Sequence, residues 1–531
     1  MIKIKVFFLS VTSGVLLCLP WVFPNFACLL FIAFVPLLLA DHMLMKFNEK
    51  QNGTFFTAAF IAFLIWNIGS TWWIAYVSFT GMMLIVGFNS LFMASVWWAG
   101  SWIRRQFGAT SGYFSLLVFW LTFEFLQHNW TLQWPWLTLG NGLANSVRTI
   151  QWFEYTGALG GSLWILLSNF LIFLAVKHFI SKSFLKAGKY AGFTLILIGL
   201  PLCLSFYLYT RTADVGAVFK VAILQPNINP YTEKFSGMNE SDQVRKLVSL
   251  AESVVYDSTD LIVAPETSLP EMWEDSLFVP GRVDQPFAGL FSKHPKISIV
   301  AGAITKRRTE RNEAISETAR KSADGSFYYD CFNSALMFDR TNKIQISHKS
   351  ILVSGVEKLP FRKYFSFLEK FTLNLGGTNG SLASSDEPVV FSTAAGVKLG
   401  PVICFESAFG EQCSKLVNMG TDMLVVITND GWWRDSPGCW QHFGYSRIRA
   451  IETRRSVVRS ANTGISGFIN KRGDVIQMTD MNRDETISAT VRLNDSHTFY
   501  ASHGDFLGRI SVLISGMIVI YFVVKRWIER D

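Results

Sequence analysis

The sequence lacks the closely spaced cysteine pairs that bind structural zinc. Its seven cysteines are irregularly spaced, at Cys18, Cys28, Cys203, Cys331, Cys404, Cys413 and Cys439. Because no C-x-x-C pair occurs, the spacing indicates neither zinc nor another metal, and we expect no cofactor. The first three lie in apolar runs, which is typical of packing cysteines. The odd count leaves at least one thiol unpaired.

The sequence also has few charges and no low-complexity segment. Charged residues make up 17% of the chain, half of it is hydrophobic, and it contains 18 Trp and 46 Phe. So much apolar side chain does not suit a single soluble domain. The formal charge is +8, with basic residues gathered at the ends of apolar runs. This pattern indicates membrane topology rather than nucleic-acid binding, although a basic soluble surface is the alternative.

Eight apolar runs are candidate membrane spans, several of them near the ~20 residues that cross a bilayer. Their bounds are 5–23, 26–40, 54–75, 80–103, 112–127, 160–179, 190–209 and 507–524. The first run has no small-residue cleavage site after it, so we expect it to be retained. Lys3 and Lys5 favour a cytoplasmic N-terminus, whereas the alternate loops 24–25, 76–79 and 128–159 contain only Arg148 as a basic residue. We therefore expect both termini inside and the segment after Tyr209 outside.

Residues 211–505 differ in kind, because short apolar runs alternate there with polar or helical segments. We expect strands at 219–224, 260–264, 297–303, 332–338, 343–348, 397–403, 421–427 and 464–470, with helices at 242–255 and 441–453. Segments 305–327 and 372–388 are expected to be an exposed loop and a mobile loop. The chain thus divides into a transmembrane domain at 1–210 with about seven helices, an extracytoplasmic α/β domain at 211–505, and a C-terminal helix with a cytoplasmic tail at 506–531.

Three expected strands end in residues that can carry chemistry together. Glu266, Lys349 and Cys404 each follow an apolar or alternating run. A thiolate attacks carbonyls well, but a thiol needs a base or a nearby cation to ionise. Glu266 could take the proton, and Lys349, with a backbone N–H after Cys404, could stabilise an oxyanion. Each residue alone is more typical of packing or of a solvated loop, so the hypothesis depends on all three.

At these positions the sequence resembles the nitrilase, or carbon–nitrogen hydrolase, superfamily, and within it the family of bacterial apolipoprotein N-acyltransferases. The motifs that carry the resemblance are Ala264-Pro265-Glu266-Thr267, Lys349, Ile403-Cys404-Phe405-Glu406, Ile427 to Trp433, Gln441 to Phe443, Arg447 to Glu452, Arg459 to Ile465 and Gly504-Asp505. The resemblance covers nearly the whole chain, including its eight runs. It implies a helical membrane bundle joined to an α/β domain with the nitrilase-like αββα sandwich fold.

The resemblance also implies roles for residues. Glu266 would be the general base, Lys349 the oxyanion stabiliser and Cys404 the acylated nucleophile, with Glu357, Glu406 and Phe405 in support. An internal salt bridge that holds Lys349 is the alternative role of the two glutamates. Arg447, Arg449 and Arg459 could bind lipid phosphate or could pair structurally. Where the family usually has Leu-Val-Pro-Phe-Gly-Glu, this chain has Leu352 to Glu357 without the proline, and Phe405 replaces a frequent tyrosine.

The implied reaction is acyl transfer from a membrane phospholipid to the N-terminal amine of a diacylated apolipoprotein. The implied location is the bacterial inner membrane, with the catalytic domain on the periplasmic side, and the implied state is a monomer that binds no nucleic acid. Trp136, Trp432 and Trp433 are candidate substrate-binding residues, although tryptophan near a membrane is usually an anchor. Two other functions remain open: a membrane-tethered amidase or nitrilase for a small envelope substrate, and a catalytically silent lipid-binding scaffold.

Overall fold

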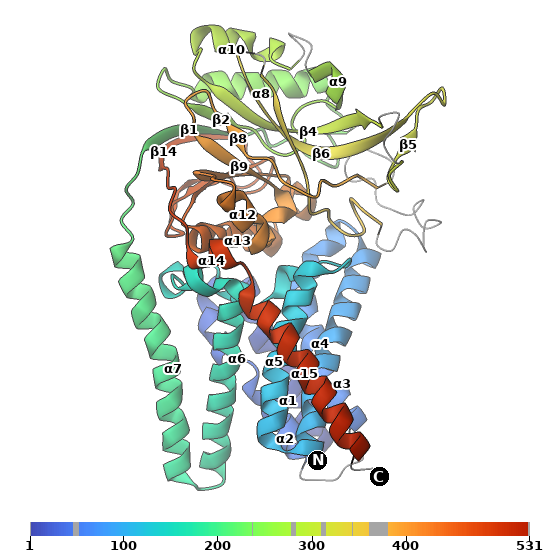
Figure 1. Cartoon of the computed structure of the whole chain (residues 1–531), viewed down its shortest axis with the longest axis vertical. Helices are drawn as coiled ribbons and strands as arrows, with labels where there is room; N and C mark the ends of the chain where they lie inside the picture. The colour runs from blue at the N-terminus through green and yellow to red at the C-terminus, as the bar shows by residue number, and fades with distance from the viewer. Residues whose placement is uncertain are drawn as a thin grey trace. The chain divides into compact units, whose positions relative to one another are not determined.

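The computed structural model describes residues 2–45, 52–235, 237–277, 283–309, 315–341, 343–359 and 381–528. It divides into two compact units (Figure 1). The helical unit comprises Met1–Trp130, Trp134–Thr212 and His503–Asp531, and the α/β unit comprises Thr131–Gln133 and Ala213–Ser502. Of the expected mobile loop 372–388, only the part from residue 381 onward lies among the described residues. That part is irregular apart from a bridge at Ala383.

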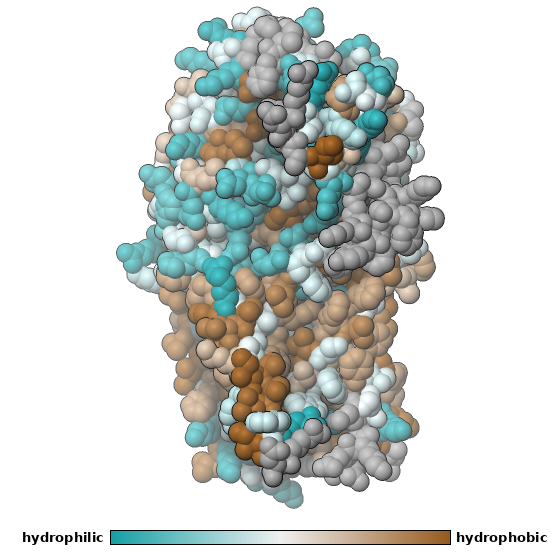
Figure 2. Space-filling view, turned by 45° about the vertical axis from the view of Figure 1, so that its right-hand side comes forward, coloured by the Kyte–Doolittle hydropathy of each residue, from teal (hydrophilic) through white to brown (hydrophobic). Residues whose placement is uncertain are grey.

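Eight helices among the described residues are long and apolar enough to cross a membrane, the number predicted. They are α1 (Ile2–Val22), η1 with α2 (Pro24–Phe31 and Val35–Met45), α3 (Asn52–Thr71), α4 (Phe79–Phe107), α5 (Ala109–Asn129), α6 (Phe153–Ile180), α7 (Phe184–Arg211) and α15 (Phe506–Ile528). The sixth helix begins at Phe153 rather than at the predicted residue 160. Figure 2 shows mostly hydrophobic side chains on the visible face of these helices, as expected of a protein embedded in lipid.

The second span is interrupted where η1 meets α2. Backbone N–H and C=O groups there form hydrogen bonds with side chains from other helices. The Phe34 N–H donates to Asn169 Oδ1 at 2.8 Å, and Asn169 Nδ2 donates to the Leu30 carbonyl at 2.7 Å. Ser13 Oγ donates to the Ala33 carbonyl at 2.6 Å. Backbone groups inside a bilayer need such partners because lipid supplies none. Asn169 of α6 therefore joins its own helix to the break.

The α/β unit contains two sheets. The first has the order β14-β1-β2-β4-β6-β5, with β3 on β4 and β7 on β6, and the second has the order β13-β12-β11-β10-β9-β8. The strands are β1 (Val218–Gln225), β2 (Leu261–Val263), β3 (Met272–Trp273), β4 (Ser298–Arg308), β5 (Arg320–Lys321), β6 (Tyr328–Asp339), β7 (Gln345–His348), β8 (Phe391–Ser392), β9 (Lys398–Ile403), β10 (Met423–Thr428), β11 (Ser456–Ala461), β12 (Gly467–Ile469), β13 (Val475–Met478) and β14 (Glu485–Arg492).

Helices cover the outer face of each sheet. The longer ones are α8 (Glu240–Val254), α10 (Ala288–Lys293), α12 (Gly410–Asn418) and α13 (Pro437–Thr453). Shorter helical elements of the chain are η3 (Trp72–Tyr76), η4 (Pro135–Leu137), η5 (Leu139–Leu143), η6 (Val147–Thr149), α9 (Glu274–Leu277), η7 (Gln285–Phe287), η9 (Cys404–Ala408), η10 (Asp430–Trp433) and α14 (Phe499–His503). The predicted helices at 242–255 and 441–453 correspond to α8 and α13.

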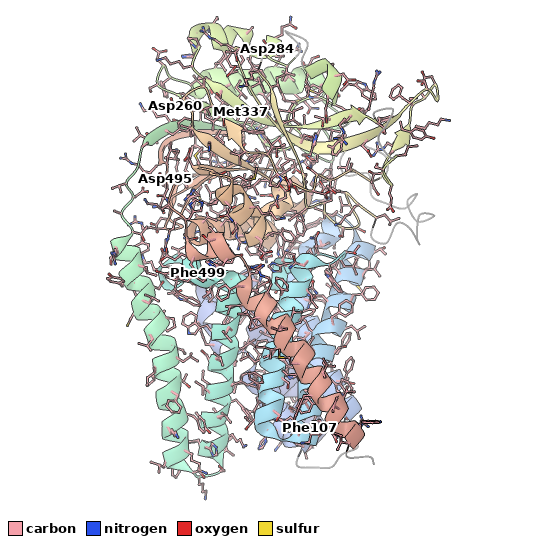
Figure 3. All side chains as sticks on the ribbon, in the orientation of Figure 1. Phe107, Asp260, Asp284, Met337, Asp495 and Phe499 are labelled. Carbon is pink, nitrogen blue, oxygen red and sulfur yellow. The ribbon has the colours of Figure 1, made fainter. Side chains whose placement is uncertain are left out.

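Strand alternation builds three apolar cores between these layers. On β1, Ala222 and Leu224 pack with α8 and α10, whereas Val221 and Ile223 pack between the sheets. Met337 of β6, labelled in Figure 3, belongs to the same central core. A third core lies between the second sheet and α12 and α13, because β10 also alternates. The order helix–sheet–sheet–helix confirms the αββα sandwich implied by the resemblance.

The directions of the strands determine where the segments that follow β2, β7 and β9 begin. Strands β1, β2 and β4 are parallel, and so are β9, β10 and β11. Strand β7 is antiparallel to β6, which is antiparallel to β4, so β7 runs in the direction of β2. The carboxyl ends of β2, β7 and β9 therefore lead into Glu266, Lys349 and Cys404.

The structure of the α/β unit differs from expectation at segment 305–327 and at the strands β3, β8, β11, β13 and β14. The segment 305–327 is not wholly a loop, because β4 continues to Arg308 and β5 pairs with β6. Strands β11 and β14 were not predicted, yet β11 is buried throughout and β14 pairs with β1 along all eight residues. Both strands carry polar residues that interrupt the apolar pattern.

Candidate active site

Cys404 lies in a strained turn at the end of a buried strand. Strand β9 ends at Ile403, and Cys404 opens η9 with a φ of 53°. Thr267, directly after Glu266, has a φ of 48°. Residues other than glycine rarely adopt this left-handed conformation, and they do so mainly where surrounding structure holds them at functional sites. Two of the three candidate residues are therefore placed by unusual turns.

Lys349 lies between two carboxylates. Its Nζ is 2.8 Å from Glu357 Oε1 and 3.4 Å from Glu266 Oε1, and the lysine side chain is 1% exposed. A buried ammonium is tolerated only when it is paired in this way. The structure thus brings Glu266 and Lys349 together, and it places Glu357 as a partner that holds Lys349.

Asn333, which we did not expect at the site, connects the two carboxylates. Its Nδ2 donates to Glu266 Oε1 at 2.7 Å and to Glu357 Oε1 at 3.0 Å. Asn333 lies in β6 and is 3% exposed. The available signal was a polar residue inside an otherwise apolar predicted strand. Hydrogen bonds from this amide and from Lys349 therefore hold Glu266 Oε1 in place.

The charges of the site act on the thiol. Burial raises the pKa of Cys404, the Glu266 carboxylate raises it further, and Lys349 lowers it, with a net rise. Burial opposes the charge of Lys349, but Glu357 and Glu266 outweigh that effect and raise its pKa. The raised pKa of Cys404 favours its thiol form, and the raised pKa of Lys349 favours its ammonium form. A thiol in this form reacts as a nucleophile only with the help of a base, and Glu266 is the carboxylate with the largest effect on the pKa of Cys404.

Glu406 ties the nucleophile turn to the lysine turn. Its Oε2 accepts from the Ile403 N–H at 2.8 Å, and its Oε1 accepts from the N–H groups of Ser350 and Ile351 at 2.7 and 3.2 Å. Burial raises the pKa of Glu406 to about 7 despite these donors. This predicted supporting residue therefore acts through the backbone on both sides of the site, while Phe405 is buried against Phe409.

Segment 354–356, where the sequence departs from the usual family motif, forms a turn. Gly355 has a φ of 86°, and its N–H donates to the Lys358 carbonyl at 2.8 Å. Glu357 Oε2 accepts from the Val353 N–H at 2.8 Å. The missing proline and displaced glycine therefore still leave the Glu357 carboxylate on Lys349.

A buried polar cluster contacts the carbonyl group of Cys404. Its members are Ser407, Asp430, His442 and Arg459. Arg459 Nη2 is 2.6 Å from Asp430 Oδ2, and His442 Nδ1 is 2.9 Å from Asp430 Oδ1. Burial raises the pKa of Asp430, but the Arg459 charge and the interactions with His442 outweigh burial and hold that pKa well below its usual value. Of the arginines considered for lipid phosphate, Arg459 is thus paired internally, as is Arg449 with Glu452. Sequence reasoning had not assigned Asp430 or His442.

The three candidate tryptophans occupy different settings. Trp432 and Trp433 are half-buried on η10, where Trp432 contacts the Tyr231 ring at 5.3 Å and Trp433 contacts the His442 ring at 5.3 Å. Trp136 belongs to the helical unit, is 1% exposed and packs against Trp73 and Trp134. Trp136 is therefore buried, unlike Trp432 and Trp433.

Comparison with known proteins extends over both units. A family model described as carbon-nitrogen hydrolase matches residues 220–500, and one described as apolipoprotein N-acyltransferase N-terminal domain matches residues 13–171. The apolipoprotein N-acyltransferase of Chlorobaculum tepidum is 29% identical over 98% of this chain and 97% of its own length. That of Geobacter metallireducens is 27% identical over 94% of this chain and 92% of its own. The solved structure of Saccharomyces cerevisiae Nit3 is 16% identical, with a TM-score of 0.36, over 53% of this chain and 92% of its own.

The sandwich fold, with glutamate, lysine and cysteine following its strands, defines a carbon–nitrogen hydrolase domain. Eight apolar helices accompany this domain, and both family models match within one chain. The chain belongs to the apolipoprotein N-acyltransferase family.

Proposed function

We propose that this membrane enzyme transfers an acyl chain from a phospholipid to the free amine of the N-terminal diacylglyceryl-cysteine of apolipoproteins. The transfer passes through a thioester on Cys404, with Glu266 as general base and Lys349 as oxyanion stabiliser. One observation carries the proposal: Lys349 Nζ lies 3.4 Å from Glu266 Oε1, and both side chains interact electrostatically with Cys404, in a chain with eight apolar helices.

In the first half-reaction, the Glu266 carboxylate takes the proton of the Cys404 thiol as the sulfur attacks the phospholipid ester carbonyl. Lys349 Nζ and the Phe405 N–H stabilise the resulting oxyanion. The intermediate then expels the lysophospholipid alkoxide, which takes the proton from Glu266. The products are a lysophospholipid and an acylated Cys404, with Glu266 again ionised.

In the second half-reaction, the acceptor amine attacks the thioester carbonyl. Glu266 takes a proton from the nitrogen, the same two donors stabilise the second oxyanion, and the Cys404 thiolate leaves. Transfer of the proton from Glu266 to the sulfur restores the thiol. One base thus serves both half-reactions, which requires its carboxylate to be held as firmly as Asn333 and Lys349 hold Glu266.

Both substrates are membrane lipids, so anchoring the hydrolase-like domain raises the rate of encounter. We place the α/β unit on the periplasmic side of the inner membrane, with both termini in the cytoplasm, because basic residues gather in the opposite loops. The enzyme acts as a monomer in this proposal. Trp432 and Trp433 offer half-buried aromatic surface beside the buried polar cluster, and we assign them to the lipid acyl chain.

The test is to incubate the purified enzyme with a phospholipid labelled in its acyl chain. We expect a protein-bound label that hydroxylamine releases and that a diacylated lipopeptide with a free amine accepts. Cys404→Ala should abolish the label, whereas Cys413→Ala, which removes a different buried thiol, should keep it. Label retained in Cys404→Ala would refute the assignment. Hydrolysis of small amides without a lipid thioester would favour the membrane-tethered amidase instead.

A further inference from the structure

The peptide that joins Cys404 to Phe405 is held by its carbonyl group. Ser407 Oγ donates to the Cys404 carbonyl oxygen at 2.9 Å, and His442 Nε2 lies 3.1 Å from the same oxygen. Ser407 Oγ and His442 Nε2 are themselves 2.8 Å apart. A carbonyl only accepts hydrogen bonds, so the His442 contact is favourable when Nε2 carries its hydrogen. Two side chains therefore converge on one backbone oxygen.

That carbonyl determines where the Phe405 N–H points. A trans peptide is planar, and its C=O and N–H point to opposite sides. The described residues contain no cis peptide. Directing the Cys404 carbonyl toward Ser407 and His442 therefore directs the Phe405 N–H away from the buried polar cluster. The φ of 53° at Cys404 would otherwise favour relaxation of this turn.

His442 is oriented from its other nitrogen. With its hydrogen on Nε2, the neutral ring accepts at Nδ1 from Arg459 Nη2, 2.9 Å away, and Asp430, whose Oδ1 also lies 2.9 Å from Nδ1, pairs with the same guanidinium. Thr428 Oγ1 donates to the same carboxylate oxygen at 2.8 Å. Thr428, Asp430 and Arg459 come from β10, η10 and β11, so three elements besides its own helix α13 fix the imidazole ring.

The cluster has the connectivity of a Ser-His-Asp triad but cannot act as one. Ser407, His442 and Asp430 are each fully buried, so no substrate reaches the hydroxyl. The Ser407 hydrogen also points to the Cys404 carbonyl. The arrangement acts on the backbone of the nucleophile rather than on a substrate.

We propose that His442 and Ser407 are positioning residues for the oxyanion site. They hold the Cys404–Phe405 peptide so that the Phe405 N–H, together with Lys349, receives the negative oxygen of both tetrahedral intermediates. The inference rests on the proposed acyl transfer at Cys404, and it adds the groups that orient the backbone donor.

A pair of substitutions at His442 tests this role. The amide nitrogen of glutamine can replace Nε2, whereas that of asparagine replaces Nδ1. We expect His442→Asn to slow acylation by Cys404 about 10- to 100-fold with KM unchanged, and His442→Gln to stay within about fivefold of the wild-type rate. A role in folding alone would not separate the two variants in this way, so thermal midpoints are measured beside the rates.

Ser407→Ala keeps the test decisive should His442→Asn fail to fold. It removes one donor from the Cys404 carbonyl with little change in volume, and we expect acylation about 10-fold slower at an unchanged thermal midpoint. His294→Asn is the matched control, because His294 follows α10 and pairs with Asp257. Its rate should equal that of the wild type.

Equal acylation rates in His442→Asn and His442→Gln, or a wild-type rate in Ser407→Ala, would overturn the inference. Neither result would affect the proposed function, which depends on loss of the acyl label in Cys404→Ala. Conversely, label retained in Cys404→Ala would remove the proposed function and the inference together.

Discussion

At the scale of single residues, the site balances one buried ammonium against two carboxylates. Lys349 contacts Glu357 at a shorter distance than Glu266. Glu357 is therefore the closer partner of Lys349, which agrees with the proposed role of Glu266 as the base.

Replacing Lys349 by methionine should disable the site electrostatically. Glu266 and Glu357 would then face each other without a cation, and the oxyanion would lose its charged donor. We expect acyl-enzyme formation to fall at least about 100-fold and stability to fall by about 3–5 kcal/mol. The double variant Lys349→Met with Glu357→Gln should recover part of the thermal midpoint without recovering acylation. Substantial acylation in either variant would contradict the assigned role.

Glu406 should make stability depend on pH. Its pKa of about 7 in the folded protein exceeds the ordinary value of 4.5, so the folded state binds the proton more tightly than the unfolded state. The stabilisation is complete below the ordinary value and is lost as pH rises through about 7, an effect on the order of 3 kcal/mol. The thermal midpoint of Glu406→Gln, measured relative to wild type from pH 5 to 8, should therefore rise. Glu240→Gln, at an exposed carboxyl, should show no such trend.

At the scale of elements, β4 supports the turn that carries Glu266. A Cβ added to Gly302 would lie 2.5 Å from the Thr267 nitrogen and 2.6 Å from the Glu266 Cα. These are backbone atoms, so Gly302→Ala must displace the turn, and we expect acylation about 10- to 100-fold slower. Gly289→Ala is a matched control because nothing lies within 4 Å of its added Cβ. A wild-type rate in Gly302→Ala at a normal thermal midpoint would show that the turn tolerates movement.

The elements that sequence reasoning found and missed differ in how their polar residues are satisfied. Strands β1, β9 and β10 were predicted nearly to their ends because each is mostly apolar, although Lys220 interrupts β1 and Lys398, Gly400 and Pro401 interrupt the run of β9. Strand β11 was missed because Arg459 interrupts it, and that arginine is buried only because Asp430, distant in sequence, neutralises it. Asn333 was missed as a site residue because its partners, Glu266 and Glu357, are also distant from it in sequence. Strand patterns reveal burial, but they do not reveal which partner makes a buried polar group acceptable.

At the scale of the whole molecule, the eight helices predict an orientation that can be measured. A reporter enzyme that is active only outside the cytoplasm should be active when fused after Tyr209, at the end of α7. The matched fusion after Lys182, between α6 and α7, should be inactive because its flanking loop is basic. The reverse pattern would place the α/β unit in the cytoplasm.

The eight spans could be counted from the sequence because length and hydropathy alone define them. Their internal breaks could not be predicted. The interruption between η1 and α2 exists because Asn169 and Ser13 replace the missing helical hydrogen bonds. Whether side chains can supply these hydrogen bonds depends on which helices are neighbours, and hydropathy does not predict which helices pack together.

Burial of the Cys404 sulfur also affects its redox chemistry. Peroxides and disulfides react with thiolates much faster than with thiols. The pKa values of Cys331, Cys413 and Cys439 are raised by burial as well. If the α/β unit faces the periplasm, where disulfides are formed, a sulfur ionised at rest would be exposed to oxidation between turnovers. A sulfur with a raised pKa would then react more slowly with such oxidants between turnovers.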